Sequence, residues 1–224
     1  DVEMGKLQRT YEAPPGIAQS CGIRPRRSIY TGKDYLPISL MQFTRGCMHS
    51  CDFCAVSSYF EKKHYIRKID EVIAEVSEQN RKMLFFVDDN IAVDKKALYE
   101  LCLELIPLKI NWVSQASLDV LHYPKVLKAM VDSGCIGNVI GFESILPQNL
   151  KDSKKLLNVA EFSKYSREIE ELRKYSLQTW AAFTLGYDQD THDSIAATAE
   201  FARNNKFTFA AFNTLTLMRK ELSR

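Results

Sequence analysis

Short apolar segments of strand length recur along the chain from residue 37 onward. Each is bounded by polar or turn-forming residues, which is typical of β-strands buried in a sheet. The pattern predicts strands over residues 38–44, 83–89, 111–117, 137–143, 179–186 and 209–216. The chain therefore carries six candidate strands separated by longer intervening segments.

The segments between these strands repeat their apolar residues at spacings of three and four, as one buried helix face requires. The spacing predicts helices over residues 70–80, 94–105, 123–134, 159–175 and 192–205. Boundary signals support two of them. Asp94 can cap the second helix, Pro124 lies near the start of the third, and Gly134 can end the third.

Strands that alternate with helices through right-handed connections form a parallel sheet covered by helices. Six strands are too few for the eight of a closed TIM barrel. We therefore predict an α/β fold, a partial (β/α)6 TIM-like barrel that is open, with parallel strands inside and helices outside. A flat doubly wound sheet is the alternative. In both folds ligands gather at the carboxyl ends of the strands.

Residues 1–36 contain Pro and Gly punctuation and no sustained period, which predicts an extended lead-in or linker. Residues 37–224 are expected to form one domain, because 224 residues with 46% hydrophobic content can bury a substantial core.

The charge balance gives no electrostatic case for a nucleic-acid partner, since 30 basic residues face 28 acidic ones. The apolar runs are too short to span a membrane, and residues 1–20 lack a signal-peptide pattern. We expect a cytoplasmic protein.

Three of the six cysteines, Cys47, Cys51 and Cys54, fall within eight positions after the first predicted strand. A disulfide framework is not expected in a chain of this size and helix content. Thiolates bind soft metals, and the Cys-x3-Cys-x2-Cys spacing lets one loop surround a single inorganic centre. Zinc would require a fourth ligand, for which His49 and His64 are candidates. A four-iron cluster held by three cysteines instead leaves one iron open for a ligand.

The loop resembles the signature of the radical S-adenosylmethionine (SAM) superfamily, Cys-x3-Cys-x-aromatic-Cys, with Phe53 as the aromatic residue. The resemblance covers most of residues 35–216 and is strongest to the subgroup with a cobalamin (B12)-binding domain. It rests on phrases such as "RGCMHSCDFC", "FFVDDN" and "GFES". Membership implies a [4Fe-4S] cluster on the three cysteines, which would be both its metal ligands and the catalytic residues, and SAM bound to the open iron.

The resemblance also implies roles for residues at the strand ends. Asp88, Asp89 and Asn90 would receive the amino group of SAM, Glu143 and Ser144 would contact its ribose, and Gly186 would allow close approach of adenine. Gln115 and Ser117 share one face of their strand and would face the cofactor or substrate. These residues could instead have a purely structural role. Asp and Asn also cap helices and end strands, and glycine also occurs in turns.

The function implied by the resemblance is reductive cleavage of SAM to a 5'-deoxyadenosyl radical, for cobalamin-dependent methylation of a small-molecule or lipid substrate. Cobalamin would be bound by a domain not in this chain. His192 follows Asp190 as in a cobalamin signature, but Ile195 replaces the expected glycine, so His192 is interpreted as a helix-start residue. The reductant would be a protein such as flavodoxin or ferredoxin.

The sequence departs from the family after residue 216, where the chain continues as "LMRKELSR" in place of the usual Pro-Gly-Thr turn. We therefore expect a C-terminally shortened domain. Three alternatives stay open: a radical SAM methylthiotransferase or rearrangement enzyme, a zinc-binding structural or interaction module, and a SAM-binding fragment that no longer catalyses.

Overall fold

The computed structural model describes residues 3–11 and 24–216. A parallel six-stranded sheet with strand order β1-β4-β5-β6-β7-β8 organises this part of the chain. Its strands are β1 (Ile38–Met41), β4 (Met83–Phe86), β5 (Asn111–Ala116), β6 (Cys135–Glu143), β7 (Gln178–Leu185) and β8 (Phe209–Thr214). All five neighbouring pairs are parallel, and β1 and β8 form two unpaired edges. The predicted open, partial barrel is therefore confirmed.

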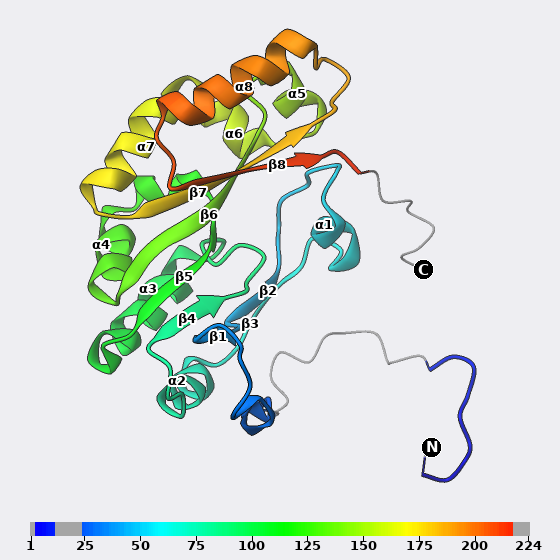
Figure 1. Cartoon of the computed structure of the whole chain (residues 1–224), viewed down its shortest axis with the longest axis vertical. Coiled ribbons are helices and arrows are strands. Elements are labelled where there is room, and N and C mark those ends of the chain that lie inside the picture. The colour runs from blue at the N-terminus through cyan, green and yellow to red at the C-terminus, as the bar shows by residue number, and fades with distance from the viewer. Residues whose placement is uncertain (1–2, 12–23, 217–224) are drawn as a thin grey trace.

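Helices cover one face of the curved sheet, as Figure 1 shows for α3, α4, α7 and α8. The longer helices are α2 (Ile69–Ser77), α3 (Lys95–Leu105), α4 (Pro124–Asp132), α7 (Tyr165–Lys174) and α8 (His192–Asn204). The shorter ones are α1 (Ala55–Tyr59), α5 (Pro147–Asp152) and α6 (Leu156–Glu161), with 3-10 turns η1 (Arg27–Tyr30), η2 (Ile106–Leu108), η3 (Leu118–His122) and η4 (Phe162–Lys164). Within residues 3–11 and 24–216, every helix is too short or too polar to span a lipid bilayer.

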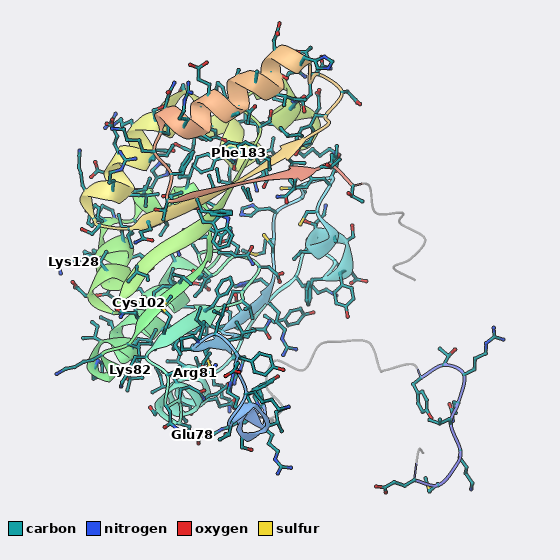
Figure 2. All side chains as sticks on the ribbon, viewed as in Figure 1. Glu78, Arg81, Lys82, Cys102, Lys128 and Phe183 are labelled. Atoms are coloured by element: carbon teal, nitrogen blue, oxygen red, sulfur yellow. The ribbon has the colours of Figure 1, made fainter. Side chains whose placement is uncertain are left out.

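The core lies between the sheet and this helical layer. Along β7, Thr179, Ala181 and Phe183 are buried, and the residues between them are more exposed, because successive side chains of a strand point to opposite faces. Cys102 of α3 and Phe183 lie in the core (Figure 2). The opposite face of the sheet is therefore the more accessible one.

Two predicted helix boundaries are confirmed. The Asp94 side chain accepts a hydrogen bond from the backbone N–H of Ala97 at 2.9 Å, and Pro124 is the first residue of α4. His192 opens α8 behind a capping box formed by Thr191 and Ser194, as expected for a helix-start residue.

The first predicted strand, residues 38–44, is wrong in its second half. Strand β1 stops at Met41, and a separate strand, β2 (Thr44–Gly46), pairs antiparallel with β3 (His64–Ile66). The chain leaves the sheet because the backbone N–H groups of Phe43 and Thr44 donate to the Asp88 carboxylate in place of a neighbouring strand.

The predicted helix over 159–175 is also wrong as a single element, because it divides into α6, η4 and α7. A 3-10 turn places side chains three residues apart on the same side. Here it brings Phe162 against Tyr165, with ring centroids 5.5 Å apart, while Tyr165 packs on Phe142 at 5.0 Å. Helices α1 and α5 were not predicted.

The lead-in contacts the barrel through Arg24 and Arg27, and Arg24 forms an ion pair with Glu78. Arg27 of η1 forms an ion pair with buried Glu75 of α2 at 2.7 Å, and its guanidinium donates to the Leu40 carbonyl at 2.6 Å. The prediction that residues 1–36 are a linker separate from one domain over 37–224 stays a prediction. Residues 1–2, 12–23 and 217–224, including the predicted shortened C-terminus, lie outside the described residues.

Candidate functional site

The cysteine loop connects β2 to α1, next to the two-stranded ladder that β2 forms with β3. Cys47 follows β2 directly, and Cys54 immediately precedes α1. All three thiols of the loop are free and half-buried. The Asp52 N–H donates to the Ser153 carbonyl at 3.0 Å, which ties the loop to the segment between α5 and α6.

Two of the predicted site residues hold the base of this loop. The Asp88 carboxylate accepts the Phe43 N–H at 3.1 Å and the Thr44 N–H, and Asp89 Oδ2 accepts the Gly46 N–H at 2.8 Å. Burial raises the pKa of Asp88 to about 6, although these donors act in the opposite direction. The two carboxylates after β4 therefore fix the backbone that leads into Cys47.

The remaining polar residues after β4 and β5 form a connected group. Gln115 Nε2 donates to the Asp88 carbonyl at 3.2 Å, and Asn90 Nδ2 donates to Ser117 Oγ at 3.1 Å. The Asn90 side chain also accepts the Ala92 N–H at 3.0 Å. The structure thus brings together the residues that the sequence placed at the ends of these neighbouring strands.

Glu143, at the end of β6, lies at the centre of a second polar group. Its backbone has φ +64°, beyond a register shift in the ladder with β7. Its Oε1 accepts from Lys155 Nζ at 3.0 Å, and its Oε2 accepts from Thr184 Oγ1 at 2.9 Å. A Cβ added to Gly141 would lie 2.2 Å from Oε1, so this glycine makes room for the carboxylate.

Lys155 links this carboxylate to the cysteine loop. Burial opposes the charge of Lys155, but Glu143 and Cys51 outweigh it and raise the pKa of the ammonium group. Burial also raises the pKa of the Cys47 and Cys51 thiols, and Lys155 acts against that shift. A partly buried cation thus stabilises the thiolate forms that bind metals.

Phe53, the aromatic residue of the motif, packs beside the same lysine. Its ring centroid lies 5.9 Å from Lys155 Nζ and 6.3 Å from the ring of Tyr187 in an edge contact. The Tyr187 hydroxyl is buried and has no hydrogen-bond partner among the described residues. An orphaned buried hydroxyl next to the loop favours a polar ligand at this place.

Ser144 and Gly186 lie just after β6 and β7, and their polar groups form hydrogen bonds with other groups of the protein. Ser144 Oγ accepts from the Leu146 N–H at 3.0 Å and from Asn149 Nδ2 at 3.1 Å. The Gly186 N–H donates to Asp190 Oδ2 at 2.8 Å. Asn149 also donates to Asp190, at 2.9 Å, so these residues shape one turn network.

The donor set and its spacing bear on which inorganic centre fits the loop. Tetrahedral zinc at a Zn–S distance of 2.3 Å holds its thiolates about 3.8 Å apart. Within residues 3–11 and 24–216, the three Sγ atoms do not all lie within 4.8 Å of one another, and neither His49 nor His64 completes such a group with them. Three free thiols spaced more widely fit a larger centre, such as a four-iron cluster.

Sequence reasoning missed Lys155 and Thr184. Lys155 is one of several lysines in the tract "LKDSKK", and Thr184 is a β-branched residue inside a strand. Neither has a distinguishing local signal. Their common feature is contact with Glu143, which the family resemblance had made a candidate.

Comparison with known proteins assigns this chain to a family. The sequence profile of the radical SAM superfamily matches residues 41–202. The chain is 28% identical to bacteriochlorophyllide d C-12(1)-methyltransferase of Chlorobaculum tepidum, covering 96% of this chain and 49% of that protein. It is 29% identical to the C-8(2)-methyltransferase of the same organism, covering 85% and 44%. The chain therefore spans about half the length of these relatives.

The fold is shared with TsrM of Kitasatospora setae, a radical SAM methyltransferase solved with cobalamin and a [4Fe-4S] cluster. The TM-score is 0.68 at 14% identity, over 79% of this chain and 36% of TsrM. The family match includes all three loop cysteines, so the resemblance noted in the sequence is confirmed. The chain belongs to the radical SAM superfamily.

Proposed function

We propose that this chain is the core of a radical SAM enzyme, with a [4Fe-4S] cluster on Cys47, Cys51 and Cys54. The observation that carries the proposal is the placement of three free thiols beside the largely shielded Lys155–Glu143 pair. When bound, the cluster supplies the electron that cleaves SAM to a 5'-deoxyadenosyl radical.

The protein residues would bind and orient the cofactors. Asp88 and Asp89 hold the backbone at the entrance to the cysteine loop, and with Asn90 they are proposed to receive the amino group of SAM. Lys155 supplies a cation beside the thiolates, and Glu143 is proposed to accept hydrogen bonds from the ribose hydroxyls. Each oxygen of this carboxylate has a protein donor and retains a further lone pair.

The remaining predicted contacts lie around this centre. Ser144 and Gly186 would line the SAM site from the ends of β6 and β7, with Gly186 next to adenine. Gln115 and Ser117 would face the cofactor or substrate from β5 and the residue that follows it.

The finer chemistry we propose is cobalamin-dependent methylation of a small-molecule or lipid substrate. The relatives are named as methyltransferases of bacteriochlorophyllide d, and another as a hopanoid C-2 methylase of Rhodopseudomonas palustris. Cobalamin would be held outside residues 1–224. A flavodoxin or ferredoxin in the cytoplasm would supply the electron. A rearrangement or methylthiolation reaction is the competing proposal at the same core.

The direct test is anaerobic reconstitution of the chain with iron and sulfide, followed by SAM and dithionite. Mass spectrometry then quantifies 5'-deoxyadenosine. We expect about four irons per chain and deoxyadenosine formation. Cys54→Ala should lose both, whereas Cys102→Ala, which alters a buried core thiol, should retain both. Retention of zinc in place of iron would overturn the proposal.

A further inference from the structure

Three metal-ligating side chains from separate elements meet outside the cysteine loop. His122 ends η3, Glu161 ends α6, and Glu168 lies in α7. His122 Nε2 is 3.5 Å from Glu161 Oε2 and 3.9 Å from Glu168 Oε1. One ligand atom from each residue lies within 4.8 Å of the other two.

The burial of this cluster is unequal. The Glu161 and Glu168 side chains are only 10% and 8% exposed, whereas His122 is 49% exposed. The second carboxylate oxygen of Glu168, Oε2, is buried and has no hydrogen-bond partner in the part of the chain that the structure describes. A buried carboxylate with an unpartnered oxygen is costly unless a cation or a proton neutralises it.

The surrounding charges do not satisfy both carboxylates. Lys164 Nζ contacts Glu161 Oε2 at 3.2 Å, but its side chain is half exposed. Burial and the contact with Glu161 raise the pKa of Glu168 to about 8, and Lys164 and Arg167 act in the opposite direction. The described side chains therefore provide no close cation that pairs with Glu168 alone.

We propose that His122, Glu161 and Glu168 form a binding site for a divalent transition-metal cation. One imidazole and two carboxylates are an accepted donor set for such cations, and the exposed His122 provides an entry path. The cation would neutralise the buried carboxylates and take the place of Lys164 at Glu161. The remaining coordination positions would be filled by water from the exposed side.

The site would act as a clamp between the segment after β5 and the segment after β6. Lys155 immediately precedes α6, and Asn158 within α6 donates to the Gly141 carbonyl at 2.8 Å. A cation that joins η3 to the end of α6 would therefore stabilise the segment that carries Lys155 to Glu143.

Binding is tested on the cluster-loaded chain, so that the loop cysteines are occupied, after a chelator has removed loosely bound iron. Mn²⁺ is the probe, because it favours oxygen and nitrogen ligands over thiolates. Free and bound Mn²⁺ are measured by electron paramagnetic resonance. We expect one bound Mn²⁺ per chain.

His122→Ala and Glu168→Gln should each weaken Mn²⁺ binding by about tenfold or more. Substitution of residues that only hydrogen-bond to metal ligands already lowers metal affinity by that factor. His192→Ala and Glu170→Gln, which alter exposed residues outside the cluster, should bind as the parent does. Equal Mn²⁺ binding by the parent and the four variants, or no binding by the parent, would overturn the proposal. Glu161 and Glu168 would then be a carboxyl pair that shares a proton.

A spectroscopic measurement on the unaltered chain keeps the test independent of variant folding. Mn²⁺ bound by His122 should show a nitrogen hyperfine coupling from one imidazole in pulsed measurements. Bound Mn²⁺ without nitrogen coupling would contradict the assignment. The result does not depend on SAM cleavage, so failure here is distinct from failure of the proposed function.

Discussion

Lys155 Nζ lies 3.0 Å from Glu143 Oε1, and this contact joins the end of β6 to the segment before α6. The side chains are 23% and 11% exposed, so the pair is largely shielded from water. Phe53 of the cysteine motif packs on the same ammonium group. The pair therefore couples the thiolates to the strand ends where SAM is proposed to bind.

Removal of the lysine charge should impair SAM cleavage. Loss of a charged hydrogen bond costs about 1.5–3 kcal/mol, which corresponds to a decrease of about tenfold or more. We expect Lys155→Met to lower the yield of 5'-deoxyadenosine by at least that factor. Lys151→Met, at an exposed position of α5, should stay within about twofold of the parent. Equal yields from the two variants would remove Lys155 from the proposed site.

The Thr184 hydroxyl should matter through Glu143. Thr184→Val keeps the shape but removes the donor to Oε2, at a cost of about 1.5 kcal/mol for a charged acceptor. SAM affinity, measured by calorimetry on the cluster-loaded chain, should fall about tenfold. Thr184→Ser retains the hydroxyl and should bind SAM nearly as the parent does. A valine variant with parental affinity would show that Glu143 does not depend on this donor.

Gly141 provides a test that leaves every charge in place. The added Cβ of Gly141→Ala would meet Glu143 Oε1 at 2.2 Å and Lys155 Nζ at 3.3 Å, so the carboxylate must move. Deoxyadenosine formation should fall as it does in Lys155→Met. Gly32→Ala strains a lead-in backbone with φ +73° but meets no atom within 4 Å of the added Cβ, so it should keep full activity even where it lowers stability. Undiminished activity of Gly141→Ala would mean that the carboxylate position is not critical.

Asp88 should make stability depend on pH in a defined direction. Its folded pKa of about 6 exceeds the ordinary value of 3.8 because burial disfavours the charged form. The folded protein then binds this proton more tightly than the unfolded chain does, so the free energy of unfolding decreases as pH rises between these values. About two pKa units correspond to about 3 kcal/mol.

The measurement for Asp88 is urea unfolding between pH 4 and pH 8, compared with Asp88→Asn. The parent should lose stability relative to this variant as pH rises, with no further relative change above pH 7. Asp193→Asn, at an exposed position, should follow the parent across the range. A constant difference between the parent and Asp88→Asn would contradict the raised pKa.

Local sequence accounted for much of the fold because the signals are periodic. Six strands and the main helices follow from alternating apolar segments, and the strand ends place Asp88, Gln115 and Glu143 at one edge of the sheet. The prediction failed where tertiary contacts override local pattern. Asp88 draws Phe43 and Thr44 away from the sheet, and the packing of Phe162 on Tyr165 divides the expected helix.

The sequence by itself determined the cysteine motif, since its spacing is local and needs no knowledge of the fold. Only the tertiary structure decided that Lys155 is the cation next to this motif. Lys155 is 12 residues from Glu143, and Thr184 is 41 residues away. The contact of His122 with Glu161 and Glu168 likewise requires η3 to pack on α6 and α7. Such contacts depend on how the helices pack on the sheet, so residue type and spacing along the chain do not specify them.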